Sequence, residues 1–501
     1  MMEGLGLEGT YGATIDRIKS QDGDKSVLGM AALMWLSHAQ RPLKADELSH
    51  ALAVELGSAD FNVSNTPSMA TLVCCCQGLI TVEKEASTVR LIHFTLQEYL
   101  SLHPETFSRP HSRLADICIT YLSSKRVKAL SADPSPDIIG IPFLRYSAVY
   151  WGVHAKRELS GSTRSLALKL LQQYDGHIST NFLLAEVPHL DLAGFGTCFP
   201  FSGLHCVSFL GIAELISALL GLGCHDINGE DFGGRTPLSW AAWNGHEGVV
   251  KALLGQDEAH PDKPDNEGRT PLSYAAWGGN GGVVEILLGR EDVHPGIPTN
   301  YGHTPLSYAA WHGCEEVVKM LLRREEVNPD EPSNHGQTPL SYAAWGGREG
   351  VVEILLKREE VDPDRPDNDS RTPLWYAAWK GHGRVVKMLL GQKQVDPSKP
   401  DHRGQIPLSC AVRSGHEEVA QILLEREDVD PEKPDNGGRA PLWYAVRFGR
   451  GRVVRMLLER SADPTRPDTN GQTPLMLAPQ HANSVVIELL EAWGAVNHIT
   501  I

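Results

Sequence analysis

From residue 236 onward, hydrophobic and polar positions recur in a fixed order. Each unit contains a small apolar block such as Leu-Ser-Tyr-Ala-Ala-Trp, a polar break with a glycine, a second block Val-Val-x-x-Leu-Leu, and a loop rich in Pro, Asp and Asn. The spacing within the second block places its Val and Leu side chains on one face of a helix. Each unit therefore predicts two short helices, and such units must stack because neither helix buries its apolar face alone.

A Pro-Leu pair marks the start of the first block in each unit. The residue before this pair recurs at a spacing of 34 six times and then of 33. A degenerate copy begins one period earlier, at Ser202. The sequence therefore predicts about nine units over 201–501, starting near 202, 236, 270, 304, 338, 372, 406, 440 and 473.

Residue types at both ends of the first block predict where its helix begins and ends. A Thr before Pro-Leu can cap the helix, and Pro suits the first helical position because it has no N–H to leave unsatisfied. Glycine at the far end favours the left-handed conformation that ends a helix. These glycines stand at 245, 279, 313, 347, 381, 415 and 449.

The complete unit, Thr-Pro-Leu-x-x-Ala-Ala followed by Gly-His and Val-Val-x-x-Leu-Leu, resembles the ankyrin repeat over about 300 residues. Tetratricopeptide repeats have a similar period, but their Trp-Leu-Gly-Tyr pattern is missing. The resemblance implies a mainly α fold, an α-solenoid of helix-turn-helix repeats with a concave face that binds a protein or peptide.

Two features depart from the family pattern. The His that usually follows Thr-Pro-Leu is replaced by Ser, which puts the side-chain bracing of the turn in doubt. These serines are Ser239, Ser273, Ser307, Ser341 and Ser409. Six units are also one residue longer than the family's 33, so we expect the turn to bulge slightly without breaking the stack.

Aromatic residues recur in register within the first block. A Trp follows Ala-Ala, and an aromatic residue precedes this Trp by three positions, so the two share a helix face. Trp and Tyr are frequent anchors of protein interfaces, but they can equally pack on neighbouring repeats, and the sequence leaves both interpretations open. The Trp row ends at two arginines, where we expect cationic contacts, and the residues at the loop tips vary between units. The candidate partner-binding residues are Trp243, Trp277, Trp311, Trp345, Trp379, Tyr274, Tyr308, Tyr342, Tyr376, Tyr301, His335, Arg413 and Arg447.

The first 200 residues follow a different pattern. We expect helices at Ala31 to Leu36, Leu43 to Leu56 and Thr66 to Gln77, and two strands at Leu79 to Glu83 and Val89 to His93. Helices followed by such a hairpin suggest a small winged-helix fold. The segments Leu43 to Leu48 and Val89 to Leu100 resemble the winged-helix segment of fungal NACHT-type receptor proteins and of inositol-deacylase-like sequences. We predict a winged-helix-like domain at 1–103, a helical connecting region at 104–200 and the array at 201–501.

Composition narrows the function classes. With 46 Lys plus Arg against 62 Asp plus Glu, the net charge of −16 disfavours nucleic acid as a partner. Sparse, irregular cysteines and the absence of a signal-like start favour the cytoplasm, with the nucleus left open. The most apolar stretch, 201–223, contains a Gly, a His and a Glu, so it predicts a helix pair and no membrane span.

Motifs for chemistry are missing from the sequence. No phosphate-binding Gly-x-x-x-x-Gly-Lys-Ser/Thr occurs, and Gly23-Asp24-Lys25-Ser26 is interpreted as a helix start. His246-Glu247 and His416-Glu417 lack the second His of a zinc protease, and we expect buried thiols at Cys74 to Cys76. We therefore expect no catalytic residues, cofactor, metal or small-molecule substrate.

The functional prediction is a protein-interaction scaffold. The alternative is the regulatory portion of a nucleotide-switched NACHT-type receptor, whose nucleotide-binding module we expect to be missing or upstream.

Overall fold

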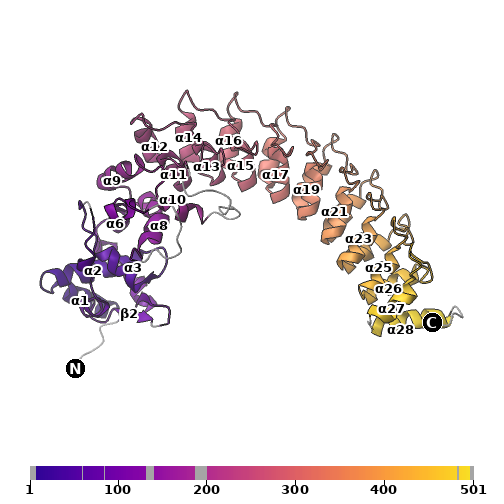
Figure 1. Cartoon of the computed structure of the whole chain (residues 1–501), viewed down its shortest axis with the longest axis horizontal. Coiled ribbons are helices and arrows are strands. Elements are labelled where there is room, and N and C mark those ends of the chain that lie inside the picture. The colour runs from indigo at the N-terminus through magenta and orange to yellow at the C-terminus, as the bar shows by residue number, and fades with distance from the viewer. Residues whose placement is uncertain are drawn as a thin grey trace. The chain divides into compact units, whose positions relative to one another are not determined.

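The computed structural model describes residues 7–58, 60–83, 85–130, 140–186, 200–481 and 484–496 (Figure 1). Contacts divide the chain into two compact units, which are Met1–Ala241 with Gly248–His260, and Ala242–Glu247 with Pro261–Ile501. This division falls inside the repeat array. The boundaries expected after residues 103 and 200 stay predictions.

The N-terminal part of the first unit combines helices with a small antiparallel sheet of order β1-β3-β2. Val89 in the central strand is paired with Leu43 on one side and Val82 on the other. The elements are α1 (Leu7–Lys19), α2 (Asp24–His38), β1 (Leu43–Lys44), α3 (Ala45–Leu52), η1 (Val63–Asn65), α4 (Met69–Cys75), β2 (Ile80–Glu83), β3 (Thr88–Leu91), α5 (Phe94–Leu102) and η2 (Pro104–Thr106).

These elements confirm the predicted hairpin and the helix start at Asp24, but the helix expected over Leu43 to Leu56 is wrong at both ends. Its first two residues form β1, and α3 begins afterwards because the Glu47 carboxylate accepts the backbone N–H of Lys44. The helix α1 was not predicted. The expectation of buried thiols holds for Cys75 and Cys76, whereas Cys74 is exposed.

Five helices follow in the described part of the region predicted to be helical. Trp35 of α2 is fully buried, with its ring centroid 5.3 Å from that of Phe143 and 5.7 Å from that of Tyr146. The N-terminal part and these helices therefore share one core, which explains why they form a single unit. The helices are α6 (Pro110–Leu122), α7 (Lys125–Lys128), α8 (Leu144–Arg157), α9 (Gly161–Leu171) and α10 (Ser179–Leu184).

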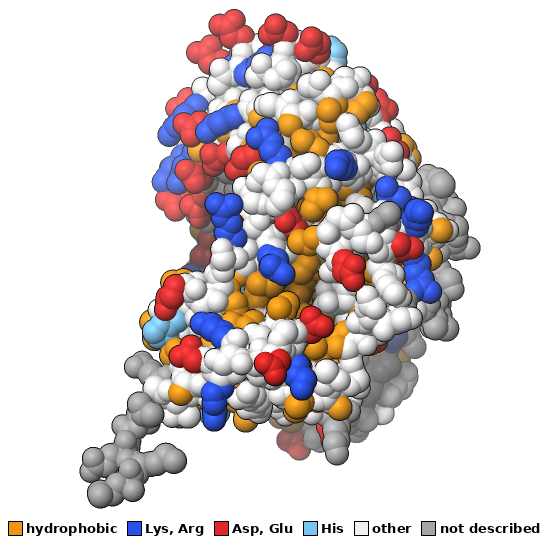
Figure 2. All heavy atoms as spheres, turned by 90° about the vertical axis from the view of Figure 1, so that its left-hand side faces the viewer, with side chains coloured by type: hydrophobic (Ala, Val, Ile, Leu, Met, Phe, Trp, Pro, Cys, Tyr) orange, Lys and Arg blue, Asp and Glu red, His pale blue; other side chains and the backbone are white. Residues whose placement is uncertain are grey.

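The face turned to the viewer in Figure 2 shows hydrophobic side chains in a hollow. Lys and Arg side chains are interspersed with Asp and Glu around this hollow. No continuous basic stripe crosses the described residues of this face.

A hydrogen-bonded chain of rings lies in the core of the first unit. The backbone N–H of Gln40 donates to the Tyr146 hydroxyl oxygen at 3.1 Å, so the hydroxyl proton is available for Nε2 of His154, 3.0 Å away. His154 then carries its proton on Nδ1, which lies 2.9 Å from Nδ1 of His111. This order leaves the remaining proton of neutral His111 on its Nε2.

Nine helix pairs lie in the part of the array that the structure describes. The segment 201–223 forms the first pair, as predicted, and no helix among the described residues is long and apolar enough to cross a membrane. The pairs are α11 (Gly203–Leu210) and α12 (Ala213–Leu220), α13 (Pro237–Trp243) and α14 (Glu247–Leu254), α15 (Pro271–Gly278) and α16 (Gly281–Leu288), α17 (Pro305–His312) and α18 (Glu315–Leu321), α19 (Pro339–Gly346) and α20 (Glu349–Leu356), α21 (Pro373–Lys380) and α22 (Gly383–Leu390), α23 (Pro407–Ser414) and α24 (Glu417–Leu424), α25 (Pro441–Arg447) and α26 (Gly451–Glu459), and α27 (Pro474–His481) and α28 (Ser484–Val496).

Helix ends in the second unit follow the predicted signals. The Thr270 hydroxyl accepts the backbone N–H of Ser273 at 3.2 Å, and Thr304, Thr338 and Thr372 cap their helices in the same way. The glycine that ends each first helix has positive φ, for example 69° at Gly279. First helices of successive repeats pack side by side (Figure 1), and their paired alanines are fully buried between them.

Acidification should loosen the first unit around α8. Burial lowers the pKa of His154 to about 3, and repulsion from His111 adds to this effect, whereas an unfolded His titrates near 6.5. Below about pH 6.5 the unfolded chain therefore binds more protons than the folded chain. The contribution of neutral His154 to the free energy of unfolding is fully present above this pH and is lost as the pH falls. At pH 5 the loss from His154 is about 2 kcal/mol.

Hydrogen exchange of the full chain at pH 7 and about pH 5, corrected for intrinsic rates, measures this effect. We expect α8 to lose protection while α19 does not, and His154→Gln to reduce the pH dependence. Equal loss in the two helices contradicts the assignment.

Candidate partner-binding face

The predicted aromatic residues lie on the first helices, but the Tyr and Trp rows differ in exposure. The four tyrosines Tyr274, Tyr308, Tyr342 and Tyr376 are buried. The tryptophans Trp243, Trp277, Trp311, Trp345 and Trp379 are partly exposed. Only the Trp row therefore offers ring surface to a partner, and the tyrosine rings are packing residues.

Each Trp in the first part of the row stacks on the Tyr of the next repeat. Ring centroids are 5.2 Å apart for Trp243 and Tyr274, and 5.4 Å apart for Trp277 and Tyr308. Trp311 and Tyr342 continue the pattern at 5.8 Å. The sequence predicted that Trp and Tyr of one helix share a face, whereas the contact that the structure shows joins neighbouring repeats.

Neighbouring Trp rings meet in two alternating ways. Trp243 and Trp277 stack directly at 5.8 Å, and Trp311 and Trp345 do so at 5.2 Å. In both cases the residue after the second Trp is a glycine. A Cβ at Gly278 would stand 2.8 Å from the carbonyl oxygen of Trp243, so only glycine allows this close approach of the two repeats.

In the intervening repeats a longer side chain covers the gap between two Trp rings. His312 lies 5.9 Å from Trp277 and 5.8 Å from Trp311. Lys380 places its Nζ 5.3 Å from the ring centroid of Trp345 and 4.5 Å from that of Trp379, which is cation–π geometry. The five tryptophans, with His312 and Lys380 between them, form a column of rings and bridging side chains, which we name the Trp column.

Side chains from the following turn tie the Trp column to the next repeat. Nδ2 of Asn280 donates to the carbonyl oxygen of Trp243 at 2.8 Å, and Nε of Arg348 donates to that of Trp311 at 2.9 Å. His382 and His416 lie at 3.0 Å from the carbonyl oxygens of Trp345 and Trp379 through Nε2. His416 is therefore a frame position, as predicted, and binds backbone.

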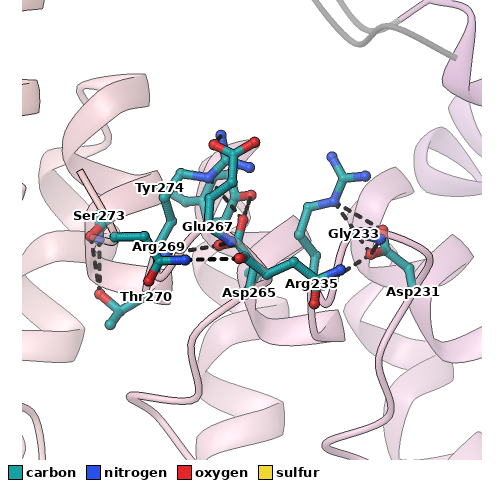
Figure 3. A network of polar contacts seen from close by, with 12 residues as sticks. Asp231, Gly233, Arg235, Asp265, Glu267, Arg269, Thr270, Ser273 and Tyr274 are labelled. Carbon is teal, nitrogen blue, oxygen red and sulfur yellow. Dashed lines mark hydrogen bonds and ion pairs between the residues drawn. The ribbon is translucent and has the colours of Figure 1, made fainter. Parts of the chain in front are cut away.

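A buried aspartate organises the loop before each of several first helices (Figure 3). Oδ1 of Asp265 accepts the backbone N–H groups of Glu267 and Arg269, and Oδ2 accepts the Tyr274 hydroxyl at 2.5 Å and Nε of Arg269 at 2.8 Å. Asp435 is held similarly by Tyr444 and Arg439. Although burial favours the neutral acid, the Tyr444 and Arg439 donors lower the pKa of Asp435.

This loop brace accounts for the missing family histidine. In the first repeat, His205 occupies the position after Ser-Gly-Leu and contacts the carbonyl oxygens of Gly229 and Arg235 through Nε2, both at 3.1 Å. In four later repeats Ser stands there and its hydroxyl pairs with the capping Thr, as in Thr270 and Ser273 at 3.2 Å. At Tyr274, Tyr376 and Tyr444, the Tyr one position further along braces the loop through its aspartate.

The loop tips are linked into a ladder. Two residues stand at each tip, as Asn334 and His335 do. The backbone N–H of the first tip residue donates to the carbonyl oxygen of the second tip residue of the preceding repeat, from Asn334 to Tyr301 and from Asn368 to His335, both at 2.9 Å. Nδ2 of Asn334 also donates to the carbonyl oxygen of Asn300 at 2.8 Å. The Asn residues therefore have a structural role, and the variable positions are the second tip residues, with Tyr301 and His335 both exposed.

The two arginines that follow the Trp row differ. Arg447 is exposed, with its guanidinium 5.4 Å from the ring centroid of Trp443. Arg413 is only partly exposed. The face changes from stacked rings to cations over these two repeats.

The described residues offer little for metal binding or covalent chemistry. No group of three or more His, Cys, Asp or Glu among the described residues is placed to hold a metal ion. Burial raises the pKa of Cys76 to about 12, so that thiol is a poor nucleophile at neutral pH.

Comparison with known families places both parts of the chain. Five overlapping stretches within 173–468 match a family model described as ankyrin repeats in three copies. Residues 17–109 match a model described as the winged helix domain of GPI inositol-deacylase. No curated protein matches the chain significantly.

Removing one brace hydroxyl should destabilise the second unit. Tyr274→Phe deletes a bond to a buried carboxylate, so we expect a loss of about 1.5–3 kcal/mol in the free energy of unfolding. Tyr308→Phe is the matched control, because Thr299 stands where Asp265 stands one repeat earlier, and its loss should be about 0.5–1.5 kcal/mol. Urea unfolding of both variants provides the measurement, and a larger loss in Tyr308→Phe would count against the brace.

Proposed function

Because the chain belongs to the ankyrin repeat family, we propose that it is a protein-interaction scaffold that binds a protein or peptide on the face formed by the Trp column and the loop tips. The observation that carries the proposal is the exposure of variable side chains on an invariant frame. Tyr301 is 54% exposed although its backbone carbonyl is fixed in the tip ladder. An exposed aromatic ring on a rigid support loses little entropy on binding, which favours an interface role.

The loops at the ends of the second helices add acidic charge. Exposed pairs of acidic residues recur there at the repeat spacing, and several are only partly neutralised by an adjacent Arg, as in Arg290 with Asp292 at 2.8 Å. The pairs are Asp257 and Glu258, Glu291 and Asp292, Glu325 and Glu326, Glu359 and Glu360, and Glu427 and Asp428. This charge supports a partner that carries basic patches.

The proposal includes a non-enzymatic role and no nucleic acid, membrane or small-molecule substrate as the array's partner. The net charge of −16 supports this for nucleic acid. A cytoplasmic location, with the nucleus left open, is supported by the eight described cysteines, all of which are free thiols.

A second candidate function is favoured by the winged-helix match at 17–109. By resemblance to fungal NACHT-type receptors, that domain would transmit the state of a nucleotide-binding module to the array. The scaffold role holds in either case, since the array remains the part that recognises the partner.

Selection of peptides by the full chain from a displayed library, followed by affinity measurement, tests the scaffold proposal. We expect a variant with Tyr301→Ala and His335→Ala to lose about tenfold or more in affinity for a selected ligand. A matched variant with Gln421→Ala and Arg452→Ala, whose side chains form an exposed hydrogen bond between the second helices α24 and α26, should retain binding within about threefold, because neither residue lies on the first helices or at the loop tips.

Failure to select any ligand that distinguishes the two variants would refute the proposed face. Circular dichroism checks that both variants are folded. The half-buried Trp rings are avoided in this test because their truncation would also remove packing between repeats.

A further inference from the structure

A polar cavity in the first unit is not used by the proposed scaffold function. Its volume of about 310 Å³ lies at the lower end of the range for small-molecule sites. Four segments contribute its lining, namely α2 with the loop after it, α5, α6 and α8. The lining residues are Ser37, His38, Ala39, Gln40, Gln97, Leu100, Ser101, His111 and Arg157.

One donor in this cavity is set by the ring chain in the core. His111 turns Nδ1 toward the fully buried His154, and the proton order that begins at Gln40 places the remaining proton of His111 on Nε2. That Nε2 has no hydrogen-bond partner among the described residues. Because Nδ1 faces His154 and His111 lines the cavity, this Nε2–H is the ring donor that remains for a ligand there.

A second ring nitrogen becomes a donor when its histidine is protonated. Nδ1 of His38 lies 3.2 Å from the carbonyl oxygen of Met34, which can only accept, so the proton of neutral His38 is on Nδ1. The Nε2 of His38 then lacks a proton. An anion in the cavity would favour the protonated ring, which offers Nε2–H as well.

The charges around the cavity are unbalanced. Arg157 is exposed at its edge and makes no ion pair with any described residue. The negative charge of Glu158 favours the protonated forms of His38 and His111. One of its carboxylate oxygens accepts the backbone N–H of Ser112 at 3.1 Å. Burial, followed by repulsion from His38 and Arg157, lowers the pKa of His111 to about 4.

We propose that this cavity binds the phosphate group of a small molecule, held by the Arg157 guanidinium and the Nε2–H of His111. A guanidinium offers two parallel N–H donors that match two phosphate oxygens. The hydroxyls of Ser37 and Ser101 lie in the same lining but donate to the carbonyl oxygens of Leu33 and Gln97, so the guanidinium and the imidazole are the donors that carry the proposal. The added negative charge would oppose the burial and the repulsion that together keep His38 and His111 neutral.

Calorimetric titration of the full chain with inorganic phosphate and with phenyl phosphate tests the proposal. We expect single-site binding that is tighter at about pH 6 than at about pH 7.5, because the complex takes up a proton on histidine. Arg157→Gln should weaken binding about tenfold or more. Arg145→Gln is the matched control, an exposed Arg of the same helix that pairs with Glu186, and should leave affinity unchanged.

The ring resonances of His38 and His111 report on the same site. We expect them to shift on addition of phosphate and the pKa of His111 to rise. Absence of binding by both probes, or equal weakening by the two Arg variants, overturns the proposal. Binding of a phosphoserine peptide but of neither small probe also overturns it, and this site is independent of the partner-binding face because the variants lie in different units.

Discussion

The array depends on burial of apolar helix faces between repeats, because no repeat has enough surface to form a core of its own. In the second helices α14 to α26 the Val side chains and the first Leu of each Leu-Leu pair are buried almost completely, as are the paired alanines of the first helices. Backbone polar groups at each junction are satisfied by the neighbouring repeat, as when Asn280 donates to Trp243. Apolar packing supplies the driving force, and these polar contacts fix the register in which successive repeats meet.

The sequence predicted the frame of the array because its signals are local. Threonine caps, first-turn prolines and helix-ending glycines act within a few residues, and the structure confirms them at Thr270 and Gly279. The nine pairs follow from the period alone. The error at Leu43 arose because a two-residue strand depends on pairing with Val89, which lies far along the chain.

The candidate site was predicted less completely, since its contacts join residues of different repeats. Nothing local distinguishes the buried Tyr274 from the half-buried Trp277, because both lie on the same helix. The loop brace did leave a signal, an Asp nine residues before the Tyr, which recurs at Asp367 and Tyr376. The two histidines of the cavity, His38 and His111, lie on different helices and form no motif, so only the folded chain brings them together.

The alternation along the Trp column has a consequence for symmetry. Glycine follows Trp277 and Trp345, whereas His312 follows Trp311 and Lys380 follows Trp379. The exposed charge on the second helices alternates with the same period, from Glu285 to Lys319 to Glu353 to Lys387. The backbone thus repeats every unit, while the surface chemistry repeats every second unit. A partner that contacts these side chains finds an equivalent surface only after a shift of two repeats. After a shift of one repeat, it would face a His or Lys side chain between two Trp rings where it had faced two directly stacked rings.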